Sequence, residues 1–228
     1  QRQMCIRDRV DSNGDLEAGF ATNGVSFLNQ IPDAKSIADL LDIPDDQTLV
    51  SCEVIGGHLA ALLDASGTLV NTFGNGGILS FTEESSITGC SLDETGMILM
   101  GTTTTDVWDN VVQCRRFDMT GTLDESFGAN GTATVDPGSV LRAISARPCP
   151  TPDGGIIIGG KGIRNIGLIA IYPFFCGLLH NGSIDPSVGL DGVMLDTVNR
   201  CEGYGPIRLG QEGRIYSWGG TTSGTDSD

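Results

Sequence analysis

Short apolar runs alternate with turns rich in Gly, Asp, Asn, Ser and Thr along most of this chain. The clearest example reads Pro-Asp-Gly-Gly-Ile-Ile-Ile-Gly-Gly at residues 152–160, a polar turn followed by a short apolar run. Runs of this length bounded by turn residues predict hairpins and buried β-strands. No segment shows a sustained helical period, so the pattern predicts an all-β fold.

One phrase occurs four times, and its third copy reads Gly-Thr-Leu-Asp-Glu-Ser-Phe-Gly-Ala-Asn-Gly at residues 121–131. The copies begin at Gly14, Gly67, Gly121 and Gly182, which lie 53, 54 and 61 residues apart. One period holds about four short strands, which is typical of the blades of a β-propeller. The sequence therefore predicts a tandem-repeat protein with about four blades.

Three positions of the phrase have a predicted structural role. An Asp precedes the starting Gly by three residues in three copies, and its side chain is expected to cap the amides of its own turn. Two apolar positions after the Gly are expected to anchor the loop on its blade. The Asp residues are Asp11, Asp64 and Asp118, and the anchors are Leu16, Leu69, Leu123 and Ile184, with Phe20, Phe73, Phe127 and Val188. The fourth copy departs, with Val188 in place of Phe and Leu179 in place of Asp.

Together the phrases Asp-x-x-Gly-x-Leu-x-x-x-Phe-Gly-x-x-Gly and Pro-Asp-Gly-Gly-Ile-Ile-Ile-Gly-Gly resemble the bacterial delta-60 repeat, from about residue 10 to residue 222. The resemblance implies a β-propeller family of unknown function, typically found in large exported or surface proteins. It therefore implies an extracellular or cell-surface location, and it brings no known catalytic residues.

The repeat phase predicts a single domain over residues 10–228. The expected parts are a part-blade at 10–28, full blades at about 29–82, 83–136 and 137–197, and a part-blade at 198–228. Residues 1–9 resemble translated adapter sequence, carry no apolar segment of a signal peptide, and are treated as an extension outside the domain. The two part-blades either meet and close a four-bladed ring or belong to an open arc of a larger propeller. The adapter-like start favours the open arc.

The chain carries a net charge of −16 and two lysines, Lys35 and Lys161. Such an acidic surface repels phosphate backbones and anionic lipids, so nucleic acid is not an expected partner. No apolar run approaches the roughly 20 residues needed to cross a bilayer, so we expect no membrane insertion. Protein and glycan partners remain compatible with this charge.

Candidate chemistry is sparse. Asp11, Asn13 and Asp15 have the D-x-N-x-D spacing of a Ca²⁺ loop, but the full motif needs a Gly and a Glu that are missing here, so an Asp-capped turn is the favoured interpretation. Ca²⁺ is the one candidate cofactor. The two histidines, His58 and His180, are too few for a triad or a zinc site.

Other side chains fit ordinary structural roles. The seven cysteines are scattered and form no C-x-x-C pair, which leaves buried free thiols or one or two disulfides open. Thr102–Thr105 with Trp108 suit a loop that holds a sugar ring, but a plain strand and loop is favoured.

The functional expectation is a non-enzymatic propeller module that binds a protein or a glycan, or scaffolds other domains. The alternative is a metal-dependent lactonase- or hydrolase-like propeller enzyme with carboxylates around its central channel. Convergence of several Asp, Glu or Asn side chains at one site would favour the enzyme.

Overall fold

The computed structural model describes residues 6–21, 23, 25–27, 31, 33–82, 85–104, 111–137, 141–165, 169–196, 203–204, 208–210, 214–216 and 219–220. Every regular element in these residues is a β-strand. Within the described part of the chain, no helix is long and apolar enough to cross a membrane.

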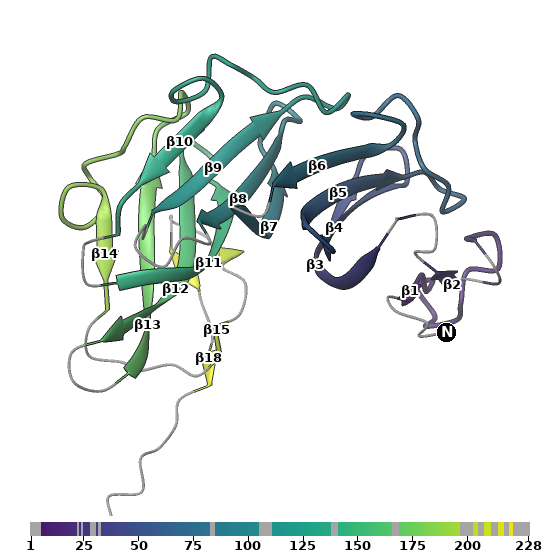
Figure 1. Ribbon diagram of the computed structural model, residues 1–228, viewed down its shortest axis with the longest axis horizontal. Coiled ribbons are helices and arrows are strands. Elements are labelled where there is room, and N and C mark those ends of the chain that lie inside the picture. The colour runs from purple at the N-terminus through teal and green to yellow at the C-terminus, as the bar shows by residue number, and fades with distance from the viewer. Residues whose placement is uncertain are drawn as a thin grey trace, which may run out of the picture.

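Three four-stranded antiparallel sheets, each made of four consecutive strands, form most of the structure (Figure 1). The first sheet contains β3 (Ala34–Ile43), β4 (Gln47–Val54), β5 (Gly57–Leu63) and β6 (Ile78–Thr82). The second contains β7 (Ser85–Leu92), β8 (Ile98–Thr104), β9 (Val112–Phe117) and β10 (Thr132–Val135). The third contains β11 (Leu141–Pro150), β12 (Ile156–Asn165), β13 (Ile169–Leu178) and β14 (Val193–Leu195). The predicted all-β fold of repeated four-stranded units is confirmed.

Three two-stranded pairs lie outside these sheets. They are β1 (Ile6–Asp8) with β2 (Val25–Phe27), β15 (Gly203–Tyr204) with β18 (Gly219–Gly220), and β16 (Arg208–Leu209) with β17 (Ile215–Tyr216). The first of these pairs includes part of the segment 1–9 that the sequence placed outside the domain.

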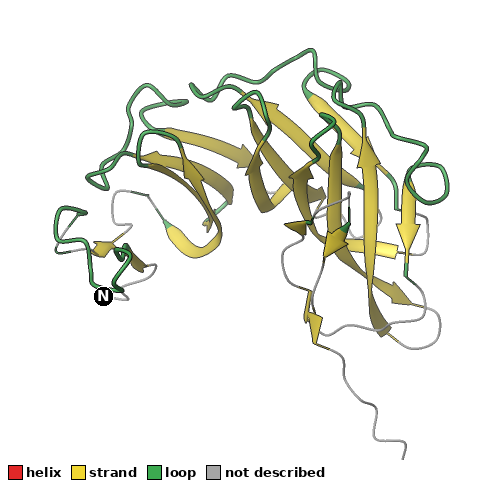
Figure 2. Cartoon of the chain, turned by 180° about the vertical axis from the view of Figure 1, so that it is seen from behind, coloured by secondary structure: helices red, strands yellow, loops and turns green. Residues whose placement is uncertain are grey.

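The three sheets stand side by side along an arc (Figure 2). The first strand of the second sheet, β7, contacts the first strands of both neighbours, β3 and β11. One apolar cluster, with Leu49, Phe73 and Ile98, fills the space between the first and second sheets. A second cluster, with Leu99 and Phe174, fills the space between the second and third. Stacked, repeated sheets of this kind fit a propeller-like architecture.

The Asp residues cap their turns as the sequence predicts. Asp118 Oδ1 accepts hydrogen bonds from the amides of Thr120 at 2.8 Å and Thr122 at 2.9 Å. Asp64 accepts the same pair of amide bonds from Ser66 and Thr68. Burial raises the pKa of Asp118, but bonds from the Thr120 hydroxyl and the turn amides outweigh it, and the net pKa lies below the usual value.

Each turn also packs on the preceding repeat, in an arrangement that we call the repeat junction. Phe73 is fully buried, and the next residue, Gly74, donates its amide to the carbonyl of Thr120 at 2.7 Å. Gly121 has a φ of +80°, and a Cβ there would lie 2.9 Å from the Gly74 amide nitrogen and 3.2 Å from the Phe73 ring. The other junctions pair Ala21 with Ser66 at 2.9 Å and Gly128 with Asn181 at 2.8 Å.

The predicted Leu anchors differ from the predicted Phe anchors. Leu69 and Leu123 are partly buried against the apolar clusters, as expected of loop anchors, whereas Leu16 is 50% exposed and Ile184 is 43% exposed. At this position the side chain packs on the closing Gly of its own repeat. A Cβ on Gly77, for example, would lie 2.9 Å from Leu69 Cβ.

Cys90, Cys114 and Cys176 are free thiols. Cys114 and Cys176 are fully buried between the second and third sheets, and burial raises the pKa of each thiol to about 12. This agrees with the interpretation of buried free thiols for these three residues. Cys5 and Cys201 lie outside the described residues.

Replacing Asp118 by Ala is expected to lower the free energy of unfolding by about 1 kcal/mol at neutral pH, because two turn amides lose their acceptor. The folded pKa is lowered, so the stabilisation is present above the unfolded pKa of about 3.9 and is lost as pH falls through the folded pKa. Urea unfolding of both proteins from pH 7 to pH 2.5 measures the difference. Glu125→Ala, an exposed change in the same repeat, is the control, and a difference that stays constant with pH would contradict the capping role.

Gly121→Ala is expected to destabilise the protein by about 2–3 kcal/mol, because it adds a steric contact at the repeat junction to an unfavourable φ. Gly96→Ala is a matched control, since Gly96 has a φ of +81° in an equivalent Asp-capped turn but open space around its Cβ position. Thermal and urea unfolding of the two variants separates the cost of the steric contact at the junction from the cost of the positive φ. Equal losses of stability would show that close approach at the junction contributes nothing.

Candidate functional site

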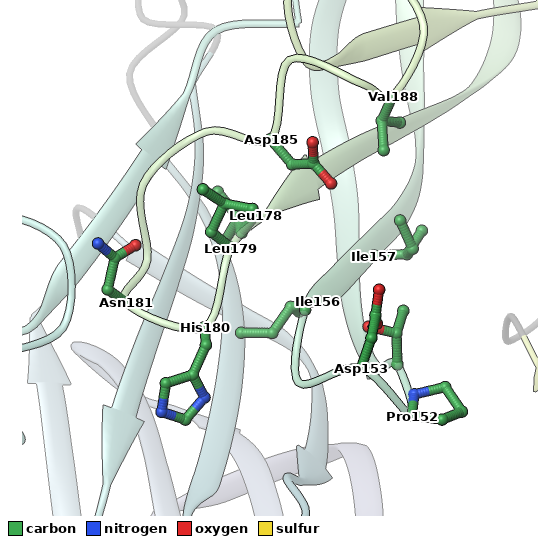
Figure 3. Close-up of a pocket in the computed structure, with 12 residues that line it drawn as sticks. Pro152, Asp153, Ile156, Ile157, Leu178, Leu179, His180, Asn181, Asp185 and Val188 are labelled. Atoms are coloured by element: carbon green, nitrogen blue, oxygen red, sulfur yellow. The ribbon is translucent and has the colours of Figure 1, made fainter.

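A pocket of about 790 Å³ opens between the β11–β12 turn and the β13–β14 loop of the third sheet. Its floor is apolar and comes from the strand ends beneath, mainly Ile156, Ile157 and Leu178 with Val188 from the loop (Figure 3). This volume lies within the range of small-ligand sites, which are commonly apolar with a few placed polar groups.

The rim of the pocket is polar and acidic. It includes Asp153 from the turn, and His180, Asn181 and Asp185 from the loop. In Figure 3 the Asp185 carboxylate projects into the pocket on the side of Val188 and Ile157. We call this site the Asp185 pocket.

The carboxylates of the rim are held by their own turns. Asp185 Oδ1 accepts a hydrogen bond from the Ser187 amide at 2.9 Å. Asp153 accepts a bond from the Thr151 hydroxyl, and this bond, aided by the amides of Asp153 and Gly155, lowers the pKa of Asp153. The Asp153 carboxylate therefore stays negatively charged at neutral pH, and the rim suits a neutral or cationic group.

A second, smaller pocket of about 350 Å³ adjoins the first. The two share Thr151, Asp153 and His180 in their linings, and the second adds Asp93 and Glu94 from the β7–β8 turn. The acidic surface therefore extends from the Asp185 pocket towards the second sheet.

In the second repeat, the place that corresponds to the Asp185 pocket is filled by the Arg116 side chain. Its guanidinium binds Asp124 Oδ2 through Nε at 2.7 Å and through a terminal nitrogen at 2.6 Å, and it donates to the His180 carbonyl at 3.0 Å. It also lies 4.7 Å from the centre of the Phe127 ring and 3.9 Å from Asp93 Oδ2. Arg116 is 7% exposed, so this cluster ties the second repeat to the loop of the third.

The predicted Ca²⁺ residues lie elsewhere, in the first turn of the chain. Asp11 Oδ1 accepts the amides of Asn13 and Asp15 at 2.8 and 3.0 Å, and Asn13 turns its amide nitrogen towards Asp11. This is the geometry of the Asp-capped turn. No group of three or more His, Cys, Asp or Glu side chains suited to a metal ion occurs among the described residues, and the Ca²⁺ site stays a prediction.

The two histidines are far apart in the fold. His58 in β5 lies 3.2 Å from the Ser86 hydroxyl through Nε2, and burial lowers its pKa. His180 lies on the rim of the Asp185 pocket. Trp108, which the sequence offered as a sugar-binding side chain, lies outside the described residues.

Sequence reasoning missed Arg116, Asp124 and Asp185. Arg116 and Asp124 fall at positions that the repeated phrase does not fix, so periodicity alone gives no reason to single them out. The available signal was the departure of the fourth copy from the phrase at Val188, which lies in the pocket lining.

No protein-family model matches the sequence, and no curated protein matches it. Among solved structures, the chain is similar to an endo-arabinase from Bacteroides thetaiotaomicron, with 13% identity, a TM-score of 0.48, and coverage of 85% of this chain and 74% of that chain. It is also similar to a protein of unknown function from Bacteroides caccae, with 9% identity, a TM-score of 0.44, and coverage of 90% and 75%. Because both TM-scores are below 0.5, neither likeness supports a statement about this chain's fold or activity.

Arg116→Leu is expected to destabilise the protein by about 3 kcal/mol, because it leaves Asp124 and Asp93 without their cation. The double variant Arg116→Leu/Asp124→Val is expected to recover more than half of this loss. Leu62 and Val70 already form this apolar pair at the same backbone positions of another repeat, where the Val70 amide donates to the Leu62 carbonyl. Urea unfolding of the three proteins measures the recovery, and a double variant as unstable as the single one would contradict the pairing.

Proposed function

We propose that this chain is a non-enzymatic module, an arc of β-propeller blades of the delta-60 type in an exported or surface-associated bacterial protein. Its role is to bind a peptide segment of another protein in the Asp185 pocket. The part of this proposal that concerns family and location rests on the repeat phrases alone. The binding role rests on the pocket.

The observation that carries the binding role is a pocket with an apolar floor at a place that is packed in the preceding repeat. Ile157 occupies the position that Leu99 occupies in the second sheet, directly after the turn. Leu99 is fully buried against the third sheet, whereas Ile157, which is 8% exposed and packs with Phe175 and Val188, lines the pocket. A pocket with an apolar floor and a few polar groups on its rim is characteristic of ligand-binding sites.

A peptide fits the pocket better than a glycan. The described lining contains no Phe, Tyr or Trp side chain on which a sugar ring would stack. Aliphatic side chains on the floor and carboxylates on the rim instead match a segment that carries an apolar residue and a positive charge.

The enzyme alternative has no corresponding site in the described residues. A metal-dependent hydrolase needs several ligands around one ion, and the carboxylates of the rim lie on separate turns without such a group.

The test is to select peptides from a random display library on the full chain and to measure their affinity for two variants. Val188→Phe places in the pocket the residue that three other repeats carry, and we expect it to fold normally and to weaken binding at least tenfold. Leu190→Phe makes a similar change in the same loop at a residue that is 80% exposed and outside the lining, and we expect it to bind as the wild type does.

Two results would contradict the proposal. One is a selection that enriches no peptide. The other is a set of peptides that bind Val188→Phe as tightly as the wild type, because such peptides would dock on another surface.

A further inference from the structure

The four repeats align residue by residue through one conserved backbone hydrogen bond. In each, an amide early in the loop donates at 2.9 Å to a carbonyl of the segment that leads into the turn. The four pairs, carbonyl residue first, are Arg9 with Glu17, Leu62 with Val70, Arg116 with Asp124, and Gly177 with Asp185. The two residues of each pair therefore hold equivalent positions in the repeat, on either side of this bond.

Three of these pairs are complementary. Arg9 binds Glu17 with Nε 2.6 Å from Oε2, and Arg116 binds Asp124 at 2.6 Å. Leu62 and Val70 form an apolar pair, with Leu62 fully buried. In the last pair the carboxylate remains but its cation has become Gly177.

Asp185 is arranged like Asp124, oxygen by oxygen. Asp124 Oδ1 accepts the Ser126 amide at 3.0 Å, which leaves Oδ2 to bind Arg116. Asp185 Oδ1 accepts the Ser187 amide at 2.9 Å in the same way. No hydrogen bond or ion pair to Asp185 Oδ2 is formed within the part of the chain that the structure describes.

The place of the missing side chain adjoins the Asp185 pocket. Val188 stands where the second repeat has Phe127, and a Cβ on Gly177 would clash with a methyl group of Val188, so Val188 covers Gly177 and the pocket lies beyond it. The smaller Val and the absent arginine leave Ile157 and Val188 as an apolar wall beside the carboxylate. A long side chain whose aliphatic part is apolar and whose end is charged fits such a wall.

We propose that the Asp185 pocket binds an arginine side chain of a partner peptide, with its guanidinium at Asp185 Oδ2 and its methylene groups against Ile157 and Val188. This inference rests on the proposed function and specifies the ligand. The partner's arginine would play the role towards Asp185 that Arg116 plays towards Asp124.

Arginine suits this place better than lysine or a metal ion. A guanidinium presents several N–H groups in one plane, and Arg116 uses two of its nitrogens on the same carboxylate oxygen of Asp124. Asp185 lies beside the apolar wall, and Asp153 lies across the rim. The guanidinium of an arginine can neutralise the Asp185 carboxylate while its methylene groups contact the wall. The net charge of −16 favours the approach of such a peptide.

The test is an NMR titration of the full chain with the peptide Ac-Leu-Arg-Leu-NH2 and with the same peptide carrying citrulline, which has nearly the shape of arginine without its charge. We expect the arginine peptide to shift the amide signals of Gly177 and Ser187 and to bind at least tenfold more tightly than the citrulline peptide. Raising NaCl from 50 to 500 mM should reduce this difference.

Two variants locate the site. Asp185→Asn is expected to weaken the arginine peptide at least tenfold and to leave the citrulline peptide unchanged. Asp191→Asn removes the same charge from the same loop at an exposed residue outside the lining, and should have less than a twofold effect. Gly177→Arg/Val188→Phe, which restores the pair of the second repeat, is expected to abolish binding.

The outcomes separate this inference from the proposed function. Equal binding of the two peptides at the pocket would overturn the arginine assignment and leave a peptide-binding pocket. Binding of neither, with library peptides still blocked by Val188→Phe, would also overturn it. A large loss of unfolding stability in Asp185→Asn would show that an arginine of this chain fills the place, and that result would overturn it as well.

Discussion

The stacking of the repeats depends on the approach of a Phe side chain to a Gly of the following turn. Because Gly has no Cβ, the following turn can approach closely enough for the backbone to bond across the junction, as Gly74 does to Thr120. The same contact buries Phe73 and Phe127 fully. It fixes the loops of successive sheets at one end of the stack, and the Asp185 pocket lies among those loops.

Residues that recur in the sequence were the ones whose roles were predictable. The spacing of Asp118 and Phe127 indicated a capped turn and an apolar anchor, and the structure has both. The sequence did not indicate that the Phe packs on the following repeat, because periodicity places residues within a unit and says little about which neighbour they meet. For the same reason it did not indicate that Leu16 would be 50% exposed while Phe20 of the same repeat is buried.

The candidate site was hidden for a different physical reason. Arg116 and Asp124 form a pair that another repeat replaces with Leu62 and Val70, so charge at these positions is not part of the repeat. Both solutions satisfy burial, one by ion pairing with hydrogen bonds and the other by apolar packing. The pocket arises where neither solution is used. The pocket could be found by comparing the repeats and looking for one that retains the carboxylate of the pair but has lost the arginine.

The buried thiols have a chemical consequence. A thiol whose pKa is raised to about 12 holds almost no thiolate at neutral pH, so Cys114 and Cys176 are protected from alkylation and oxidation while the second and third sheets stay packed. Both belong to the apolar cluster between these two sheets. Their reactivity towards a small thiol reagent therefore measures how often the second and third sheets separate. The two thiols are thus a built-in probe of local unfolding.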